Sequence, residues 1–232
     1  MIAGMIRTVF TDFRTYLAAP RLIAPAPLHD GRMRWAIMVG TYLAGLVVLG
    51  VMLLGWQRAL HLPAPEAFRG FSAQMLAAAV VLAAPIGEEV AFRGWLTGRP
   101  RALWLLAMAL VGGALLGAVS AHWHDQAAAL GFVSTVLAAL IGWLALRRRA
   151  GPPRWFTRHF GLWFYLSVAV FGLSHLANYP RLSWALVPMV LPQIWAGLVF
   201  GYLRMRHGLI ASILAHATGN AVALAFALLS AH

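Results

Sequence analysis

The stretch AQMLAAAVVLAAPIGEEVAFRGWL, residues 73–96, decides how the chain folds and raises the question of why charged side chains lie within it. Its length and apolar content are those of a helix that crosses a bilayer, which needs roughly 20 such residues. Yet Glu88, Glu89 and Arg93 lie in its second half, and ionisable groups inside a membrane span are costly and usually functional. The stretch therefore predicts both a membrane span and a functional site.

Six further apolar segments have the length of a span. The chain is 62% hydrophobic and 10% charged, which excludes an ordinary soluble domain. We predict an all-α, polytopic transmembrane helix bundle of about seven spans that forms a single domain over residues 35–232. The expected spans are 35–56, 73–96, 101–121, 127–146, 160–178, 183–203 and 208–230.

Residues 1–34 are expected to form an N-terminal interfacial helix and a proline-rich connector. Apolar residues recur at helical spacing from Ile2 to Leu17, but Arg7 and Arg14 interrupt them. This pattern is typical of a helix that lies in the membrane interface rather than of a signal peptide. Pro20, Pro25 and Pro27 then predict a non-helical connection.

The net charge of +12 comes from arginine alone, because the chain has no lysine. With the N-terminus in the cytoplasm and the C-terminus outside, only Arg58, Arg69 and Arg181 face outward, as the positive-inside rule expects for seven spans. No groove-reading or stacking motif accompanies the charge, so we expect contact with the lipid bilayer and no nucleic acid. The lysine-free composition indicates a bacterial inner membrane.

The polar residues of three spans are candidates for a catalytic site. Glu89 and Arg93 are four residues apart and share a helix face, whereas Glu88 points about 100° away. We therefore expect Glu89 to pair with Arg93 and Glu88 to stay free as a general base. His216 and Asn220 are also four apart, as two donors to one oxyanion require, although structural hydrogen bonding is the alternative. His175 near the end of the fifth span is either structural or catalytic.

A loop between the third and fourth spans contains His122, His124 and Asp125. These residue types can bind zinc or another divalent metal, so a metal site here stays open as an alternative. The chain has no cysteine, which excludes thiolate chemistry and disulfides. We otherwise expect no cofactor.

Three of these patterns, taken together and in order, resemble the motifs of the CAAX prenyl protease type II family, also called the CPBP or ABI group of membrane endopeptidases. They are Glu88-Glu89-(three residues)-Arg93, Phe171-(three)-His175 and His216-(three)-Asn220. The resemblance covers about residues 73–100 and 160–225. It implies intramembrane proteolysis of membrane-bound or lipidated peptides by a water that a glutamate activates.

The resemblance also implies a role for each motif residue. Glu88 would be the general base and His175 would help to hold the water, while His216 and Asn220 would stabilise the oxyanion. Glu89 and Arg93 would support the site structurally. The substrate and any prenyl group on it are not specified by these motifs.

The spacing departs from the family pattern, because 87 positions separate Glu88 from His175. An inserted helix pair at about 101–146 would account for the difference. His122 lies nearer the usual family distance and competes with His175, but Ala118 stands where the second motif has phenylalanine, so we favour His175. Two other functions stay open: a non-proteolytic scaffold, immunity factor or chaperone partner on the same fold, and a proton-coupled transporter.

Overall fold

The computed structural model describes residues 2–26, 31–67 and 70–229. Pro27, Arg69 and Ser230, which enter the predictions above, lie outside these residues. The chain divides into two units, of which one comprises the described residues of Met1–Arg93 and Phe160–His232 and the other is Gly94–His159. Each unit is described separately below.

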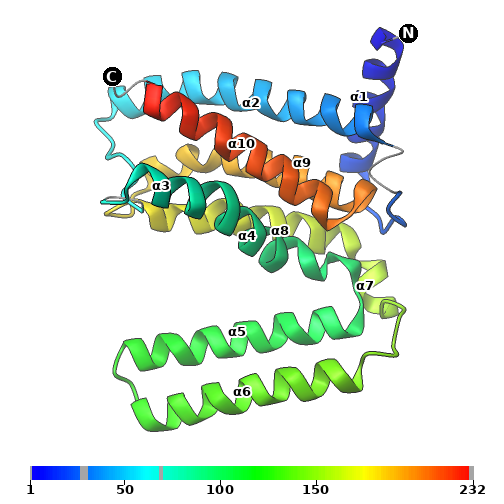
Figure 1. The fold of residues 1–232 in the computed structure, drawn as a ribbon, viewed down its shortest axis with the longest axis vertical. Helices are drawn as coiled ribbons and strands as arrows, with labels where there is room; N and C mark the ends of the chain where they lie inside the picture. Colours follow the sequence, from blue (N-terminus) through cyan, green and yellow to red (C-terminus); the bar gives the residue numbers. More distant parts are fainter. Residues whose placement is uncertain (1, 27–30, 68–69, 230–232) are drawn as a thin grey trace. The chain divides into compact units, whose positions relative to one another are not determined.

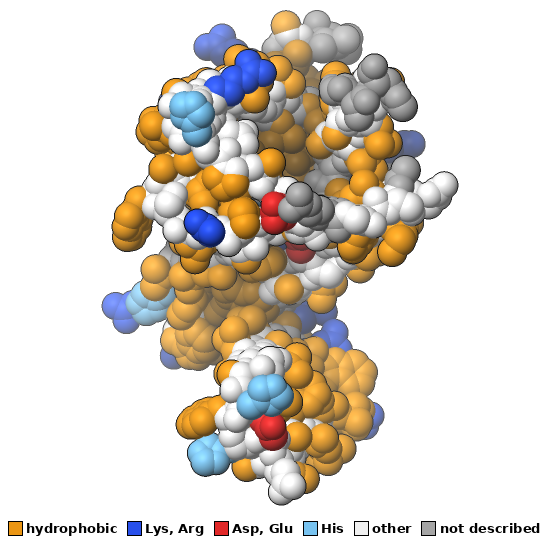
Figure 2. All heavy atoms as spheres, turned by 90° about the vertical axis from the view of Figure 1, so that its left-hand side faces the viewer, with side chains coloured by type: hydrophobic (Ala, Val, Ile, Leu, Met, Phe, Trp, Pro, Cys, Tyr) orange, Lys and Arg blue, Asp and Glu red, His pale blue; other side chains and the backbone are white. Residues whose placement is uncertain are grey.

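The structure confirms the predicted all-α, polytopic fold. Seven helical segments are long and apolar enough to cross a membrane, and the described residues contain no strand. Apolar side chains cover much of the surface visible in Figure 2, as expected for helices whose outer faces contact lipid. The seven segments are Arg32–Ala59, Gln74–Thr97, Pro100–Ser120, Asp125–Ala145, Phe160–Asn178, Trp184–His207 and Leu209–Leu229.

The first unit is built around helix α9 (Leu191–His207). Its residues from Val199 to Met205 are all buried, and a helix that is apolar and buried on every side is a central one. It contacts α2 (Arg32–Ala59), α8 (Phe160–Ser174) and α10 (Leu209–Leu229), which run beside it in Figure 1.

Helix α1 (Ile2–Ala18) crosses the end of α2 steeply in Figure 1. Its face formed by Val9, Phe13 and Tyr16 is buried. The rings of Phe13 and Tyr16 lie 5.1 and 5.5 Å from that of Tyr202 on α9. Phe10 on the same helix is 40% exposed. The helix is thus amphipathic as predicted, and its place in the membrane interface stays a prediction.

The second span is not a continuous α-helix. It consists of α3 (Ala73–Leu76), a π-helix η2 (Ala77–Ala83), α4 (Ala84–Arg93) and a 3₁₀ turn η3 (Gly94–Thr97). The Ala84 N–H bonds to the carbonyl of Ala79, five residues back. In that register the partner of the Val80 carbonyl would be residue 85, which is proline and has no N–H. Pro85 therefore leaves the Val80 carbonyl without a backbone donor.

Two 3₁₀ segments complete the first unit. η4 (His175–Asn178) follows α8, and η5 (Trp184–Val190) precedes α9. The predicted span 183–203 thus begins as a 3₁₀ helix, in which Pro188 lies. Proline lacks the N–H that a regular α-helix would use at this position.

The second unit contains η3, α5 (Pro100–Ser120), α6 (Asp125–Ala145) and the short α7 (Arg154–Arg158). The indole of Trp104 donates to the carbonyl of Ala138 at 3.0 Å, which ties α5 to α6. These two helices occupy the stretch that the motif spacing marks as an inserted pair. The predicted domain boundaries remain a prediction.

Candidate active site

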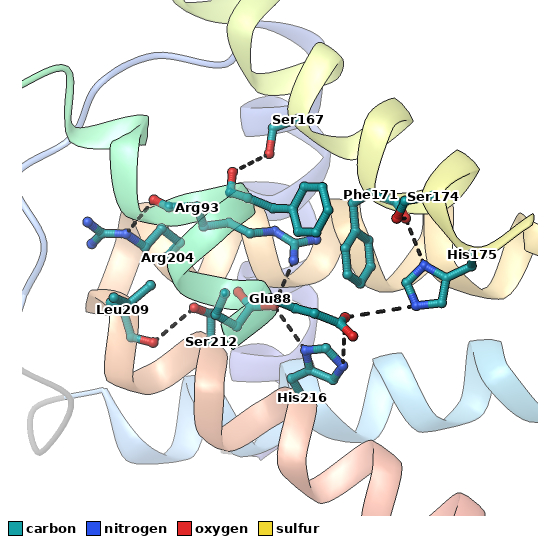
Figure 3. Close-up of polar contacts among 12 residues, drawn as sticks. Glu88, Arg93, Ser167, Phe171, Ser174, His175, Arg204, Leu209, Ser212 and His216 are labelled. Atoms are coloured by element: carbon teal, nitrogen blue, oxygen red, sulfur yellow. Dashed lines mark hydrogen bonds and ion pairs between the residues drawn. The ribbon is translucent and has the colours of Figure 1, made fainter. Parts of the chain in front are cut away.

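The centre of the first unit holds a buried ion pair. Arg93 Nη1 lies 2.7 Å from Glu89 Oε1, and both side chains are completely buried. The guanidinium carbon of Arg93 also lies 3.9 Å from the centre of the Phe171 ring. The (i, i+4) spacing on α4 brings the two charges together, and Figure 3 shows Arg93 beside the ring of Phe171.

Side chains from two neighbouring helices bind the C-terminal end of α4. Where the helix changes to a 3₁₀ turn at Gly94, its last carbonyls lose their regular partners. Ser167 of α8 donates to the carbonyl of Phe92 at 2.6 Å, and Arg204 Nε of α9 donates to that of Arg93 at 3.1 Å. Both bonds appear in Figure 3. They hold the C-terminal end of α4, the helix that carries the glutamates, against α8 and α9.

Glu88 points away from the ion pair toward two histidines. Its Oε2 lies 3.9 Å from His175 Nε2 and 3.8 Å from His216 Nε2. The Glu88 side chain is 30% exposed, in contrast to the fully buried Glu89. Figure 3 shows the carboxylate of Glu88 between the two imidazoles, which come from η4, directly after α8, and from α10.

The partners of the other ring nitrogens determine how each histidine is protonated. His175 Nδ1 lies 2.8 Å from the Phe171 carbonyl, which can only accept, so Nδ1 carries the proton. His216 Nδ1 lies 3.1 Å from Glu89 Oε1, the carboxylate oxygen that Arg93 also binds, so here too Nδ1 is the donor. In the neutral imidazoles both Nε2 atoms are then acceptors.

Three acceptors thus converge on one point: Oε2 of Glu88 and the Nε2 atoms of His175 and His216. Glu88 Oε2 is buried and makes no hydrogen bond to a described residue. Separations of 3.8 and 3.9 Å are too long for direct hydrogen bonds but suit a bridging water. The arrangement favours a species that donates protons, such as water.

This point opens on a cavity of about 560 Å³ within the first unit. The cavity brings together all four residues that the motifs marked as catalytic, and its walls are otherwise mostly apolar. Those four are Glu88, His175, His216 and Asn220. Asn220 Nδ2 also donates at 2.8 Å to the Val80 carbonyl, the group that Pro85 leaves without a backbone partner. One N–H of the Asn220 amide is therefore used in a bond to the π-helix.

Several cavity residues were not singled out from the sequence, and two polar ones among them are Tyr42 and Gln193. Tyr42 of α2 lines the cavity, and so does Gln193 in the first turn of α9, whose Oε1 is buried and has no hydrogen-bond partner in the described part of the chain. Both are polar groups within apolar spans, which is the signal that could have identified them. Tyr42 lies far from the motifs in sequence and Gln193 belongs to none of them.

The alternative metal ligands lie in the second unit. His122 Nδ1 is 3.3 Å from Asp125 Oδ2, with side chains 86% and 52% exposed, and His124 contacts the ring of Trp123. Within the described part of the chain, no group of three or more such side chains has the arrangement of a metal site. In the first unit it is His175 that faces Glu88 across the cavity.

Comparisons with known proteins bear on this geometry. A family model described as Type II CAAX prenyl endopeptidase Rce1-like matches residues 70–153 and 149–222. No curated protein and no solved structure matches the chain. The two matched segments contain all three motifs, and the first runs through α5 and α6. Because they cover well over half of its length, the chain belongs to the Type II CAAX prenyl endopeptidase Rce1-like family of membrane proteases.

Proposed function

We propose that the chain is an intramembrane endopeptidase that cleaves membrane-anchored, lipidated peptides by means of a water activated by Glu88. The observation that carries the proposal is the convergence of Glu88 Oε2 with the Nε2 atoms of His175 and His216 at a cavity. A water at that point donates one proton to the carboxylate and one to an imidazole. Its oxygen lone pair is then free to attack a peptide carbonyl.

The chemical step needs no covalent enzyme intermediate. Glu88 takes a proton from the water as the new C–O bond forms, and the carbonyl π electrons move onto oxygen. Asn220 donates its remaining amide N–H to that oxyanion. Glu88 then returns the proton to the leaving amine nitrogen as the C–N bond breaks, and a carboxylic acid and an amine are released.

The surroundings of the site fit this role. Glu89 accepts from both Arg93 and His216, so the ion pair fixes the orientation of an imidazole that faces Glu88. Apolar side chains such as Leu46, Val80 and Phe92 line the cavity and suit a substrate with a lipid-like chain.

The experiment compares peptide cleavage by purified protein in liposomes, with prenylated and unprenylated C-terminal peptides as substrates. Glu88→Gln and His175→Ala should each abolish cleavage and leave the folded protein intact. Glu66→Gln is the matched control, since this third glutamate is exposed and outside the cavity. Undiminished cleavage by Glu88→Gln refutes the mechanism. Intact peptides together with proton-coupled uptake in vesicles would indicate a transporter instead.

A further inference from the structure

The active-site cavity is lined by a hydrogen-bond donor from α2 that no motif covers, the hydroxyl of Tyr42. Residues Tyr42, Leu46 and Gly50 lie four apart along α2 and line the cavity as one face of that helix. The match to the family model begins at residue 70, so α2 lies outside it. The helix thus brings a polar group to the site from a part of the chain that the motifs do not reach.

The phenol of Tyr42 lies against α10 at Gly219. A Cβ at Gly219 would come within 2.7 Å of Tyr42 Cζ and closer still to the hydroxyl oxygen, so only glycine leaves room for the ring. Gly219 lies three residues after His216 and directly before Asn220, on the face of α10 that lines the cavity. The hydroxyl is therefore placed beside the two residues to which the motifs assign the oxyanion.

The position of the ring is fixed by its neighbours. Tyr42 is 3% exposed, and its ring meets that of Phe200 edge-on at 4.8 Å. Phe200 in turn stacks on His216, also at 4.8 Å. Trp195 Nε1 donates to the backbone carbonyl of Tyr42 at 3.1 Å. A side chain held in this way presents its hydroxyl without further ordering.

The site needs this donor because the motif residues supply few. Neutral His216 gives its Nδ1 proton to Glu89 and presents a lone pair at Nε2. Asn220 gives one of its two amide protons to Val80 and keeps one. A tetrahedral oxyanion is usually stabilised by more than one preorganised donor, and tyrosine is among the side chains that serve.

The hydroxyl of Tyr42 is free for that purpose. Among the described residues the hydroxyl makes no hydrogen bond, and the bond from Trp195 goes to the backbone carbonyl of Tyr42. A phenylalanine would keep the ring against Gly219 and Phe200 and would lose only the hydroxyl. A polar group kept in an apolar wall without a partner carries a cost unless a ligand or water satisfies it.

We infer that Tyr42 is a further catalytic residue, whose hydroxyl donates a hydrogen bond to the oxyanion together with Asn220. This inference rests on the proposed function and adds a group from α2 to it. As the water adds to the carbonyl carbon, the π electrons move onto oxygen and Tyr42 binds that oxygen through its O–H. The phenol keeps its proton throughout, because Glu88 carries the proton of the water.

The test is Tyr42→Phe, which removes one oxygen atom and leaves the ring against Gly219 and Phe200. Loss of one oxyanion donor lowers kcat by about 10²-fold, and KM should stay as in the wild type. Tyr165→Phe is the matched control, since this tyrosine of α8 donates to the carbonyl of Leu17 and does not line the cavity. The control should cleave at the wild-type rate.

A second measurement does not depend on turnover. A peptide phosphinate, which is tetrahedral and anionic at phosphorus, should bind Tyr42→Phe more weakly by about the factor lost in kcat. The uncleaved peptide should bind Glu88→Gln and the double variant Glu88→Gln/Tyr42→Phe with the same affinity. Because both assays report on folded protein, a small loss of stability does not obscure the result.

The outcomes separate this inference from the proposed function. If Glu88→Gln abolishes cleavage but Tyr42→Phe keeps the wild-type kcat and phosphinate affinity, the role of Tyr42 is refuted and the proposed function stands. An equal loss of affinity for phosphinate and uncleaved peptide would also refute it, since the hydroxyl would then bind the ground state. If the wild type shows no cleavage that depends on Glu88, both fall together.

Discussion

Replacing Arg93 by methionine should destabilise the protein more than any other single change around the site. The variant leaves Glu89 as a completely buried carboxylate whose cationic partner, at 2.7 Å in the wild type, is gone. It also removes the contact of the guanidinium with the Phe171 ring at 3.9 Å. Breaking a buried ion pair on one side costs about 3–5 kcal/mol.

That cost is a large fraction of the roughly 5–15 kcal/mol by which folded proteins are usually stable. A loss of about 3–5 kcal/mol changes the folding equilibrium by a factor of roughly 10² to 10⁴. The double variant Glu89→Gln/Arg93→Met removes both charges and should recover most of the loss, because a buried pair replaced as a whole is often neutral. Its cleavage rate should stay low, since His216 loses the carboxylate that orients it.

The assay is equilibrium unfolding in mixed micelles for the wild type, the two single variants and the double variant. The cycle gives the coupling energy between the two side chains, expected at about 3 kcal/mol or more. Arg14→Met is the matched control, because Arg14 is exposed on α1 and surface changes usually stay within about 0.5 kcal/mol. A stability of Arg93→Met within about 1 kcal/mol of the wild type would show that the pair does not hold the site.

Three further predictions address the glutamate, the π-helix and the second unit. Glu88→Gln should lower cleavage by at least about 10²-fold while the unfolding transition stays in place, because this side chain is partly exposed and its Oε2 makes no hydrogen bond to a described residue. A shifted transition would assign Glu88 a structural role. Pro85→Ala restores an N–H to the second span, so the protein should be at least as stable as the wild type. Its kcat should fall, because the Val80 carbonyl no longer needs Asn220 as a donor and the amide loses its fixed orientation. An unchanged kcat would refute this link between the π-helix and Asn220. Gly142→Ala places a Cβ about 2.6 Å from Trp104 Cδ1 and should destabilise the α5–α6 pair by about 1–3 kcal/mol. The loss should be seen as earlier proteolysis of the second unit. The control Gly113→Ala should show no such change, because the space at Gly113 is open.

The spans could be predicted from the sequence because their cause is local. A run of about 20 apolar residues is sufficient to predict a span, and all seven predicted segments are helical in the structure. The kind of helix was not predicted, since α, π and 3₁₀ helices share an apolar pattern. Pro85 and Pro188 were visible in the sequence, but proline alone does not say whether a helix kinks, widens or tightens.

Some contacts of the site could be predicted from the sequence and others could not, and the difference depends on how far apart the residues lie in the chain. The Glu89–Arg93 pair depends on a four-residue spacing within one helix, so periodicity sufficed to predict the contact. The approach of His175 and His216 to Glu88 depends on how three helices pack, and only the resemblance to known motifs suggested it. Tyr42 had neither a local spacing nor a motif, so its place beside Gly219 emerged only from the packing of α2 on α10.

Three polar side chains of the site each use part of their polar group for a structural hydrogen bond and turn the rest toward the cavity. His175 uses Nδ1 to bind a backbone carbonyl and His216 uses Nδ1 to bind Glu89, so each ring turns Nε2 toward Glu88. Asn220 divides its amide in the same way between the Val80 carbonyl and the cavity. One half of each side chain is thus fixed by the fold, and the other half faces the cavity. A residue that lost its structural partner would lose its orientation as well, which is why Glu89, Arg93 and Pro85 should affect catalysis without touching the substrate.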